Sequence, residues 1–159
     1  MSQDGIELTT SLGYLLKQAS SALRVAMEAE LRPLGMTVTH YSCLELLSQR
    51  PGLSNSELAR GAFVTRQSMN VLLLALERDG FVTRPDQARV GKVLPTRLTP
   101  RGRRSLEKAT VAVRSVELRM LAGLTPEQRS DAFPILQSMI RSLSDAPDAH
   151  AETGPGPAH

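Results

Sequence analysis

The stretch SNSELARGAFVTRQSMNVLLLALERDGFVTR, residues Ser54 to Arg84, has the pattern of two helices joined by a short turn. Ser54 is a favourable N-cap, and Glu57 stands three residues later, where it can complete a capping box. The first helix is predicted to end at Gly61, because glycine tolerates the left-handed backbone that closes many helices. Thr65 can then cap the second helix.

The second predicted helix, which ends at Gly80, has two different faces. One face carries apolar residues at helical spacing, namely Met69, Leu72, Leu73 and Leu76. The other face presents Arg66, Gln67 and Asn70 within the first two turns. Arginine can form paired hydrogen bonds with guanine, and glutamine or asparagine with adenine, so this face suits the DNA major groove. The alternative is an ordinary helical hairpin with a solvated polar face.

Positive charge is concentrated around this helix pair. The chain as a whole carries a net charge of +3, but the segment from Arg60 to Arg104 holds ten basic residues and three acidic ones, a net +7. A basic patch beside a reading helix is the electrostatic footprint of nucleic-acid binding.

The sequence period changes after Gly80 and predicts a β-hairpin. Residues 81–84 and 93–99 have strand character, and the turn-rich segment between them carries Arg89 and Lys92. A hairpin with basic residues at its tip, directly after a reading helix, is typical of a wing that grips the DNA backbone or minor groove. A solvated surface hairpin is the alternative.

Two helices are predicted before the pair. Apolar residues at helical spacing predict the first from about residue 8 to Arg32, where Pro33 ends it. Thr37 or Thr39 can cap the next helix, over about 40–49.

Two helices are also predicted after the wing. Thr99 followed by proline marks the start of one, and Thr125 followed by proline marks the start of the other. Pro134 lies inside the last helix, where it is expected to break or kink it at a cost of roughly 3 kcal/mol.

The predicted fold is mainly α with a small β-hairpin wing. We expect an N-terminal dimerisation helix, a winged helix-turn-helix DNA-binding domain, C-terminal dimerisation helices and a disordered tail, over residues 1–33, 34–99, 100–143 and 144–159. The apolar stripes of the first and last helices need a partner, and a second copy of the chain would supply one.

This order of segments resembles the MarR family of bacterial transcription regulators over roughly residues 8–143. The matching motifs are LSNSELA at Leu53–Ala59, LERDGFVTR at Leu76–Arg84 and the Leu-Thr-x-x-Gly at Leu98–Gly102. The family wing usually has an acidic residue followed by paired arginines, where this chain has Arg89-Val90-Gly91-Lys92.

The resemblance implies a homodimer with intertwined first and last helices. It also implies repression through a palindromic operator, and release by a small phenolic or aromatic effector. Two-fold symmetry would place two reading helices about 34 Å apart on the DNA. We expect base contacts from Arg66, Gln67 and Asn70. Phosphate contacts are expected from Ser54, Ser56, Thr65, Ser68 and Arg84, and wing contacts from Arg89, Lys92 and Arg97.

Candidate effector-binding residues are those that offer stacking or a partner for a carboxylate. They are Tyr14, Arg24, His40 and Tyr41. Each has an ordinary alternative, because Tyr41 suits the core, Arg24 a solvated face and His40 a helix start.

Other functions are less well supported. Cys43 could make the protein a redox-sensing regulator, although a lone cysteine more often packs in a core. A winged-helix protein-interaction module without DNA binding is a further alternative. We find no metal-ligand cluster, phosphate loop or nucleophile motif, and therefore expect neither an enzyme nor a cofactor. The single cysteine and the absence of a signal or membrane-spanning stretch predict a cytoplasmic protein.

Overall fold

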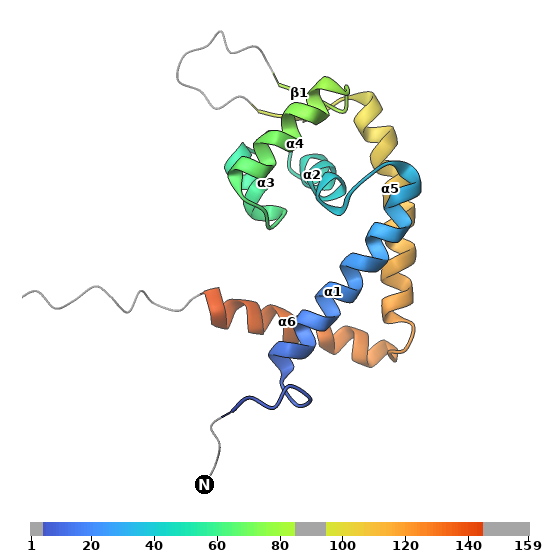
Figure 1. Ribbon diagram of the computed structural model, residues 1–159. Helices are drawn as coiled ribbons and strands as arrows, with labels where there is room; N and C mark the ends of the chain where they lie inside the picture. Colours follow the sequence, from blue (N-terminus) through green and yellow to red (C-terminus); the bar gives the residue numbers. More distant parts are fainter. Residues whose placement is uncertain (1–4, 85–94, 145–159) are drawn as a thin grey trace, which may run out of the picture. The chain divides into compact units, whose positions relative to one another are not determined.

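A computed structural model describes residues 5–84 and 95–144 of the chain (Figure 1). The expected wing tip, with Arg89 and Lys92, and the expected tail after residue 144 lie outside the described residues. The backbone divides into two units, one up to Met120 and one from Leu121 onward. In chain order the elements are α1 Leu12–Leu31, the 3-10 helix η1 Arg32–Leu34, α2 Val38–Gln49, α3 Asn55–Gly61, α4 Arg66–Arg78, β1 Val82–Thr83, β2 Arg97–Leu98, α5 Pro100–Leu121 and α6 Pro126–Ser144.

The helices begin where side chains can cap them. Thr37 accepts a hydrogen bond from the backbone N–H of His40 at 3.1 Å, so α2 begins at Val38. Ser11 accepts one from the N–H of Tyr14 at 3.2 Å. For this reason α1 begins at Leu12, four residues later than the apolar pattern predicts. Thr125, which the sequence predicts as the start of the last helix, and Gln128 bond reciprocally at 2.9 and 3.2 Å and open α6.

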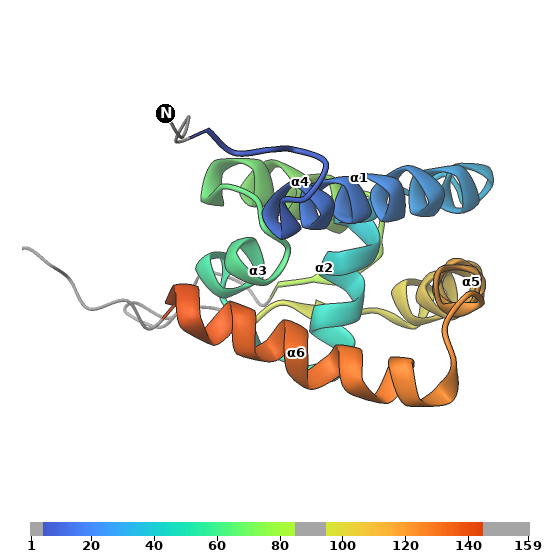
Figure 2. The ribbon, with the colours of Figure 1, turned by 90° about the horizontal axis from the view of Figure 1, so that it is seen from below.

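Helix α2 lies at the centre of the first unit. Two perpendicular views place it between the α3–α4 pair and α5 (Figures 1 and 2). Its buried side carries Cys43, Leu44 and Leu47. Leucine dominates the core, as the shortage of aromatic residues requires, and the largest fully buried side chains are Leu31, Leu44, Leu47, Leu58, Met69, Leu73, Leu76 and Val82.

The base of the hairpin joins α4 to α5. Strands β1 and β2 pair antiparallel, with Val82 opposite Leu98 and Thr83 opposite Arg97. The hydroxyl of Thr99 donates to the carbonyl of Gly80 at 2.6 Å and accepts from the N–H of Gly102 at 3.0 Å. One threonine therefore caps α5 and fixes that helix to the end of α4.

The expectation that Pro134 breaks the last helix is wrong. The helix runs from Pro126 to Ser144 with the proline inside it, so the expected break is absent. A proline forfeits one backbone hydrogen bond, to the residue four positions earlier, and leaves the rest of the ladder available. None of residues 126–144 is buried. Among the described residues, no helix is both long and apolar enough to cross a membrane.

Candidate nucleic-acid interface

The two helices of the turn motif begin at the caps that the sequence predicts, Ser54 and Thr65. In α3 the backbone N–H of Glu57 donates to the Ser54 hydroxyl at 3.2 Å. The Glu57 carboxylate accepts from that same hydroxyl at 3.1 Å, rather than from the backbone N–H of the cap. In α4 the N–H of Ser68 donates to the Thr65 hydroxyl at 3.1 Å, and the two hydroxyls bond at 3.0 Å.

The two faces of α4 separate as predicted. Met69, Leu73 and Leu76 are buried, and Leu72 is partly buried against the same core. Arg66, Gln67 and Asn70 are exposed over the first turns of the helix. The packing of the apolar face therefore leaves a planar cation and two side-chain amides outside, where a DNA groove could receive them.

The other expected DNA contacts fall into three groups. Thr65, Ser68 and Arg97 are exposed, and Ser54 and Ser56 are half-buried near the start of α3. Arg89 and Lys92 lie outside the described residues. Arg84 is placed less favourably than expected. Its Nε atom lies 3.2 Å from the Oε2 atom of Glu77, and its Nε and Nη2 atoms are buried without a hydrogen bond to any residue that the structure describes.

The contact between Arg84 and Glu77 is an ion pair without hydrogen-bond alignment. The side chains are 24% and 45% exposed, so the guanidinium lies largely within the subunit. It is also close enough to Cys43 to favour the thiolate of that residue. A phosphate contact by Arg84 stays a prediction that this geometry does not favour.

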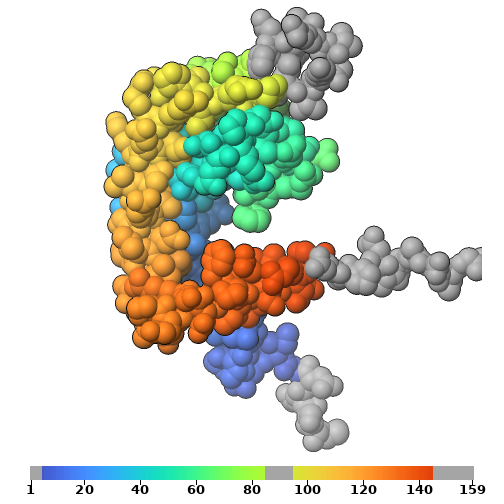
Figure 3. Space-filling model, turned by 180° about the vertical axis from the view of Figure 1, so that it is seen from behind, coloured from blue at the N-terminus to red at the C-terminus, as the bar shows by residue number. Residues whose placement is uncertain are grey.

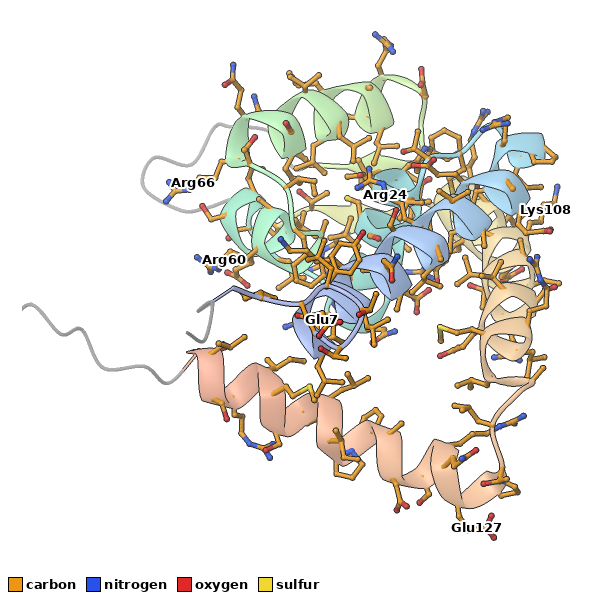
Figure 4. The ribbon with its side chains drawn as sticks, turned by 60° about the horizontal axis from the view of Figure 1, so that its bottom comes forward. Glu7, Arg24, Arg60, Arg66, Lys108 and Glu127 are labelled. Atoms are coloured by element: carbon orange, nitrogen blue, oxygen red, sulfur yellow. The ribbon has the colours of Figure 1, made fainter. Side chains whose placement is uncertain are left out.

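Exposed cations extend the polar face of α4. Arg60 on α3 and Arg66 at the start of α4 project on the same side of the first unit (Figure 4). Further exposed arginines lie in β2, at position 97, and in the first turns of α5, at positions 101, 103 and 104. Cations on neighbouring elements favour a polyanionic partner and steer its approach.

The surroundings of Cys43 favour packing over redox sensing. The side chain is fully buried in α2. Burial raises the pKa of its thiol to about 12, and the opposing effect of Arg84 is smaller. Because the thiolate is the reactive form, a thiol that stays protonated at neutral pH reacts slowly with oxidants. The position and the pKa favour packing.

The structure does not gather the four candidate effector residues around one point. Tyr14 and Arg24 are ten residues apart on α1, or about 15 Å along the helix axis. Arg24 bonds Glu28 at 3.2 Å. The ring of His40 meets Phe81 edge-on, with centroids 5.2 Å apart. Tyr41 is half-buried, and burial raises the pKa of its hydroxyl, helped by Glu45 and Glu117.

Three cavities among the described residues are lined mostly by residues that the sequence did not place in a site. One of about 290 Å³ between α1 and α5 is lined by Ala19, Ala22, Leu23, Ala26, Val116, Arg119 and Met120. The alanines of α1 in this lining recur at steps of three and four, so they share one helix face. Small side chains on that face allow another group to approach the helix closely. A second cavity, of about 310 Å³, is lined by Glu28, Arg32, Gly35, Met36 and Thr37.

The third cavity lies at the hairpin base. It has about 390 Å³ and is lined by Leu47, Ser48, Pro51, Arg97, Leu98 and Arg103. The surface of β2 and the start of α5 adjoins that of α2 in this region (Figure 3). Within residues 5–84 and 95–144, histidine, cysteine and carboxylate side chains form no group of three or more that could hold a metal ion.

A capped, exposed reading helix, a two-stranded hairpin base and a basic surrounding surface define a winged helix-turn-helix protein. The model of the MarR family matches residues 36–89. The HTH-type transcriptional repressor Rv2887 of Mycobacterium tuberculosis is 47% identical over 135 residues, which make up 85% of this chain and 97% of that repressor.

Solved structures agree with this relationship. The M. tuberculosis MarR family protein Rv2887 in complex with salicylic acid has a TM-score of 0.69 and 44% identity, covering 82% of this chain and 96% of the other. Its complex with DNA has a TM-score of 0.69 and 43% identity, covering 82% and 98%. The chain belongs to the MarR family of transcriptional regulators, which confirms the predicted fold class and the resemblance.

Proposed function

We propose that this chain is a homodimeric, cytoplasmic repressor that occupies a palindromic DNA operator and is released by a small aromatic acid. The observation that carries the proposal is the exposed set Arg66, Gln67 and Asn70 on the capped first turns of α4. Burial of the opposite face fixes the direction in which these side chains project. The complex of Rv2887 with DNA supports the same use of the fold.

The proposed contacts divide between bases and backbone. Arg66, Gln67 and Asn70 read base edges in the major groove. The hydroxyls and cations around them hold phosphates and set the register of the protein on the duplex. These backbone residues are Ser54, Ser56, Thr65, Ser68, Arg97 and, in the wing, Arg89 and Lys92.

The effector is proposed to enter the cavity between α1 and α5. Its walls are mainly apolar and suit an aromatic ring, while Arg119 supplies a cation for a carboxylate. The Nη1 atom of Arg119 is 3.8 Å from the Oε1 atom of Glu30, a loose and exposed pairing that a ligand could replace. The complex of Rv2887 with salicylic acid supports this ligand class. Participation of Tyr14, Arg24, His40 and Tyr41 stays a prediction.

The test is a titration of the DNA upstream of the protein's own gene with wild type and Arg66→Ala, each with and without salicylate. Loss of the paired bonds to guanine should cost Arg66→Ala about 1–3 kcal/mol of operator affinity and relax its sequence preference. Salicylate should release the wild type, and Arg119→Ala should bind DNA without responding to salicylate.

A matched control for this titration is Arg78→Ala. Arg78 lies at the other end of α4, is 75% exposed and pairs with Asp79 at 3.3 Å. Its removal changes the charge equally but should not alter sequence preference. If Arg66→Ala and Arg78→Ala behave alike, the assignment of the reading face is wrong.

A further inference from the structure

Phe63, in the turn between α3 and α4, has a backbone conformation that suits glycine. Its φ angle is 58°, and it is the only residue other than glycine with a positive φ in the described part of the chain. The N–H of Phe63 bonds the carbonyl of Arg60 at 3.3 Å, and the N–H of Val64 bonds that of Ala59 at 3.0 Å. These two bonds form a Schellman motif, whose left-handed position is usually glycine.

Packing within the subunit does not account for a phenylalanine at this position. The residue is 95% exposed, the highest value among the large apolar side chains of the described residues. A bulky side chain in the left-handed region is strained, and such strain persists at binding sites where the side chain has a use. Phe63 therefore bears a conformational cost that its contacts in the isolated subunit do not offset.

The surroundings of Phe63 indicate what covers its ring. Arg60 stands three residues before it and Arg66 three residues after it, and both are exposed. The two arginines project on the same side, at the end of the motif where α4 begins (Figure 4). An exposed aromatic ring that is flanked in the sequence by two exposed cations, in the turn before the proposed reading residues, is suited to a duplex with phosphates outside and apolar sugars and methyl groups within reach.

We propose that Phe63 is a further DNA-contacting residue, whose ring packs on the apolar surface of the duplex at the edge of the groove that α4 enters. The partner group is a deoxyribose or a thymine methyl, both of which accept apolar side chains. The contact rests on the proposed DNA binding. It explains why the turn keeps a strained phenylalanine where glycine would close α3 without strain.

The test separates DNA affinity from stability with three variants of the full chain. Phe63→Gly removes the ring and the strain, Phe63→Ala removes the ring but keeps a Cβ at positive φ, and Phe63→Tyr keeps both. Phe63→Gly and Phe63→Ala should each bind the upstream DNA about tenfold more weakly, while Phe63→Tyr stays within about threefold of wild type. Phe63→Gly should also raise the midpoint of thermal unfolding, by about 2–4 °C.

If Phe63 had only a structural role, Phe63→Gly would bind DNA more weakly and would also be less stable than wild type. This lower stability would overturn the proposal. Equal binding by wild type and Phe63→Gly would overturn it as well, while leaving the proposed function intact. Failure of the wild type to bind any upstream DNA would instead remove both. Light scattering that finds Phe63→Gly monomeric, with wild type dimeric, would assign the ring to a second copy of the chain and overturn the DNA contact.

A modified duplex identifies the contacted group. Replacing thymidine by deoxyuridine removes the thymine methyl groups and leaves the sugars. If wild type binds the deoxyuridine duplex more weakly than the thymidine duplex, while Phe63→Gly binds both duplexes equally, the ring contacts a thymine methyl. Unchanged binding by wild type would assign it to deoxyribose.

Discussion

His40 links the stability of the reading domain to pH. It lies at the start of α2, half-buried and edge-on to Phe81, and its Nε2 atom is buried without a hydrogen-bond partner among the described residues. Burial lowers the pKa of its imidazole below the ordinary 6.5, and Asp79 opposes this only in part. The folded protein therefore prefers the neutral ring, and the unfolded chain binds the extra proton more readily.

The resulting contribution to stability is fully present above pH 6.5 and decreases as the pH falls from there through the lower pKa of the folded state. Urea unfolding of wild type and His40→Gln at pH 7.5 and 5.5 measures this change. The free energy of unfolding should decrease more steeply for wild type on acidification. Parallel pH dependence in the two proteins would show that His40 does not titrate differently on folding.

Single residues also show where sequence reasoning reaches its limit. Arg66, Gln67 and Asn70 could be placed outside because their neighbours define an apolar face with helical period. The largely buried position of Arg84 could not be predicted, because it depends on Glu77, which lies seven residues earlier on another element. The positive φ of Phe63 could not be predicted either, because the sequence around the end of α3 suggests that Gly61, rather than Phe63, has that conformation. Long-range pairing and backbone angles decide these cases.

At the scale of elements, the junction between β1 and α5 depends on a close approach at Gly102. This glycine is buried, and a Cβ added to it would collide with the carbonyl oxygen of Phe81. The same carbonyl accepts the N–H of Thr99 at 3.1 Å, so it cannot easily move away. Gly102→Ala should therefore lower the free energy of unfolding by about 1–3 kcal/mol, the usual cost of overpacking.

A second glycine provides the control for Gly102→Ala. Gly13 lies in α1, where an added Cβ would meet only the Ser11 hydroxyl at an ordinary 3.8 Å. Gly13→Ala should stabilise the protein by roughly 0.5–1 kcal/mol, because alanine loses less backbone freedom in a helix. Denaturant titrations of both variants give the comparison. A neutral Gly102→Ala would mean that the junction relaxes without cost.

Local chemistry explains why element boundaries were predictable. The caps at Ser54, Thr65 and Thr125 act within three residues of themselves, so a short window of sequence contains the whole signal. The start of α1 was misplaced because the apolar period continues past Ser11, which caps the helix. The proposed effector cavity was not predicted for a different reason. It combines α1 with α5, about ninety residues later, and no local pattern records that pairing.

At the scale of the whole molecule, exposed apolar surface supports the proposed dimer. On α6, Phe133, Ile135, Leu136, Ile140 and Leu143 are all at least 45% exposed, and on α1 Leu12, Leu15 and Leu16 are at least 41% exposed. A helix of 19 residues with none of them buried is marginal in water. Burial against a second copy would supply the stabilisation that α6 lacks and would pair two reading helices for a palindrome.

Charge placed on the apolar stripe of α6 should therefore dissociate the dimer. Leu136 is one of the five exposed apolar residues of α6 named above and is 45% exposed, whereas its neighbour Gln137 is polar and also exposed. In Leu136→Glu a carboxylate would have to enter an apolar interface, which is costly without a partner. Light scattering at micromolar concentration should find wild type and Gln137→Glu dimeric and Leu136→Glu monomeric. Operator affinity should fall with the dimer, because a lone subunit contacts only one half-site. A dimeric Leu136→Glu with normal operator binding would exclude α6 from the subunit interface.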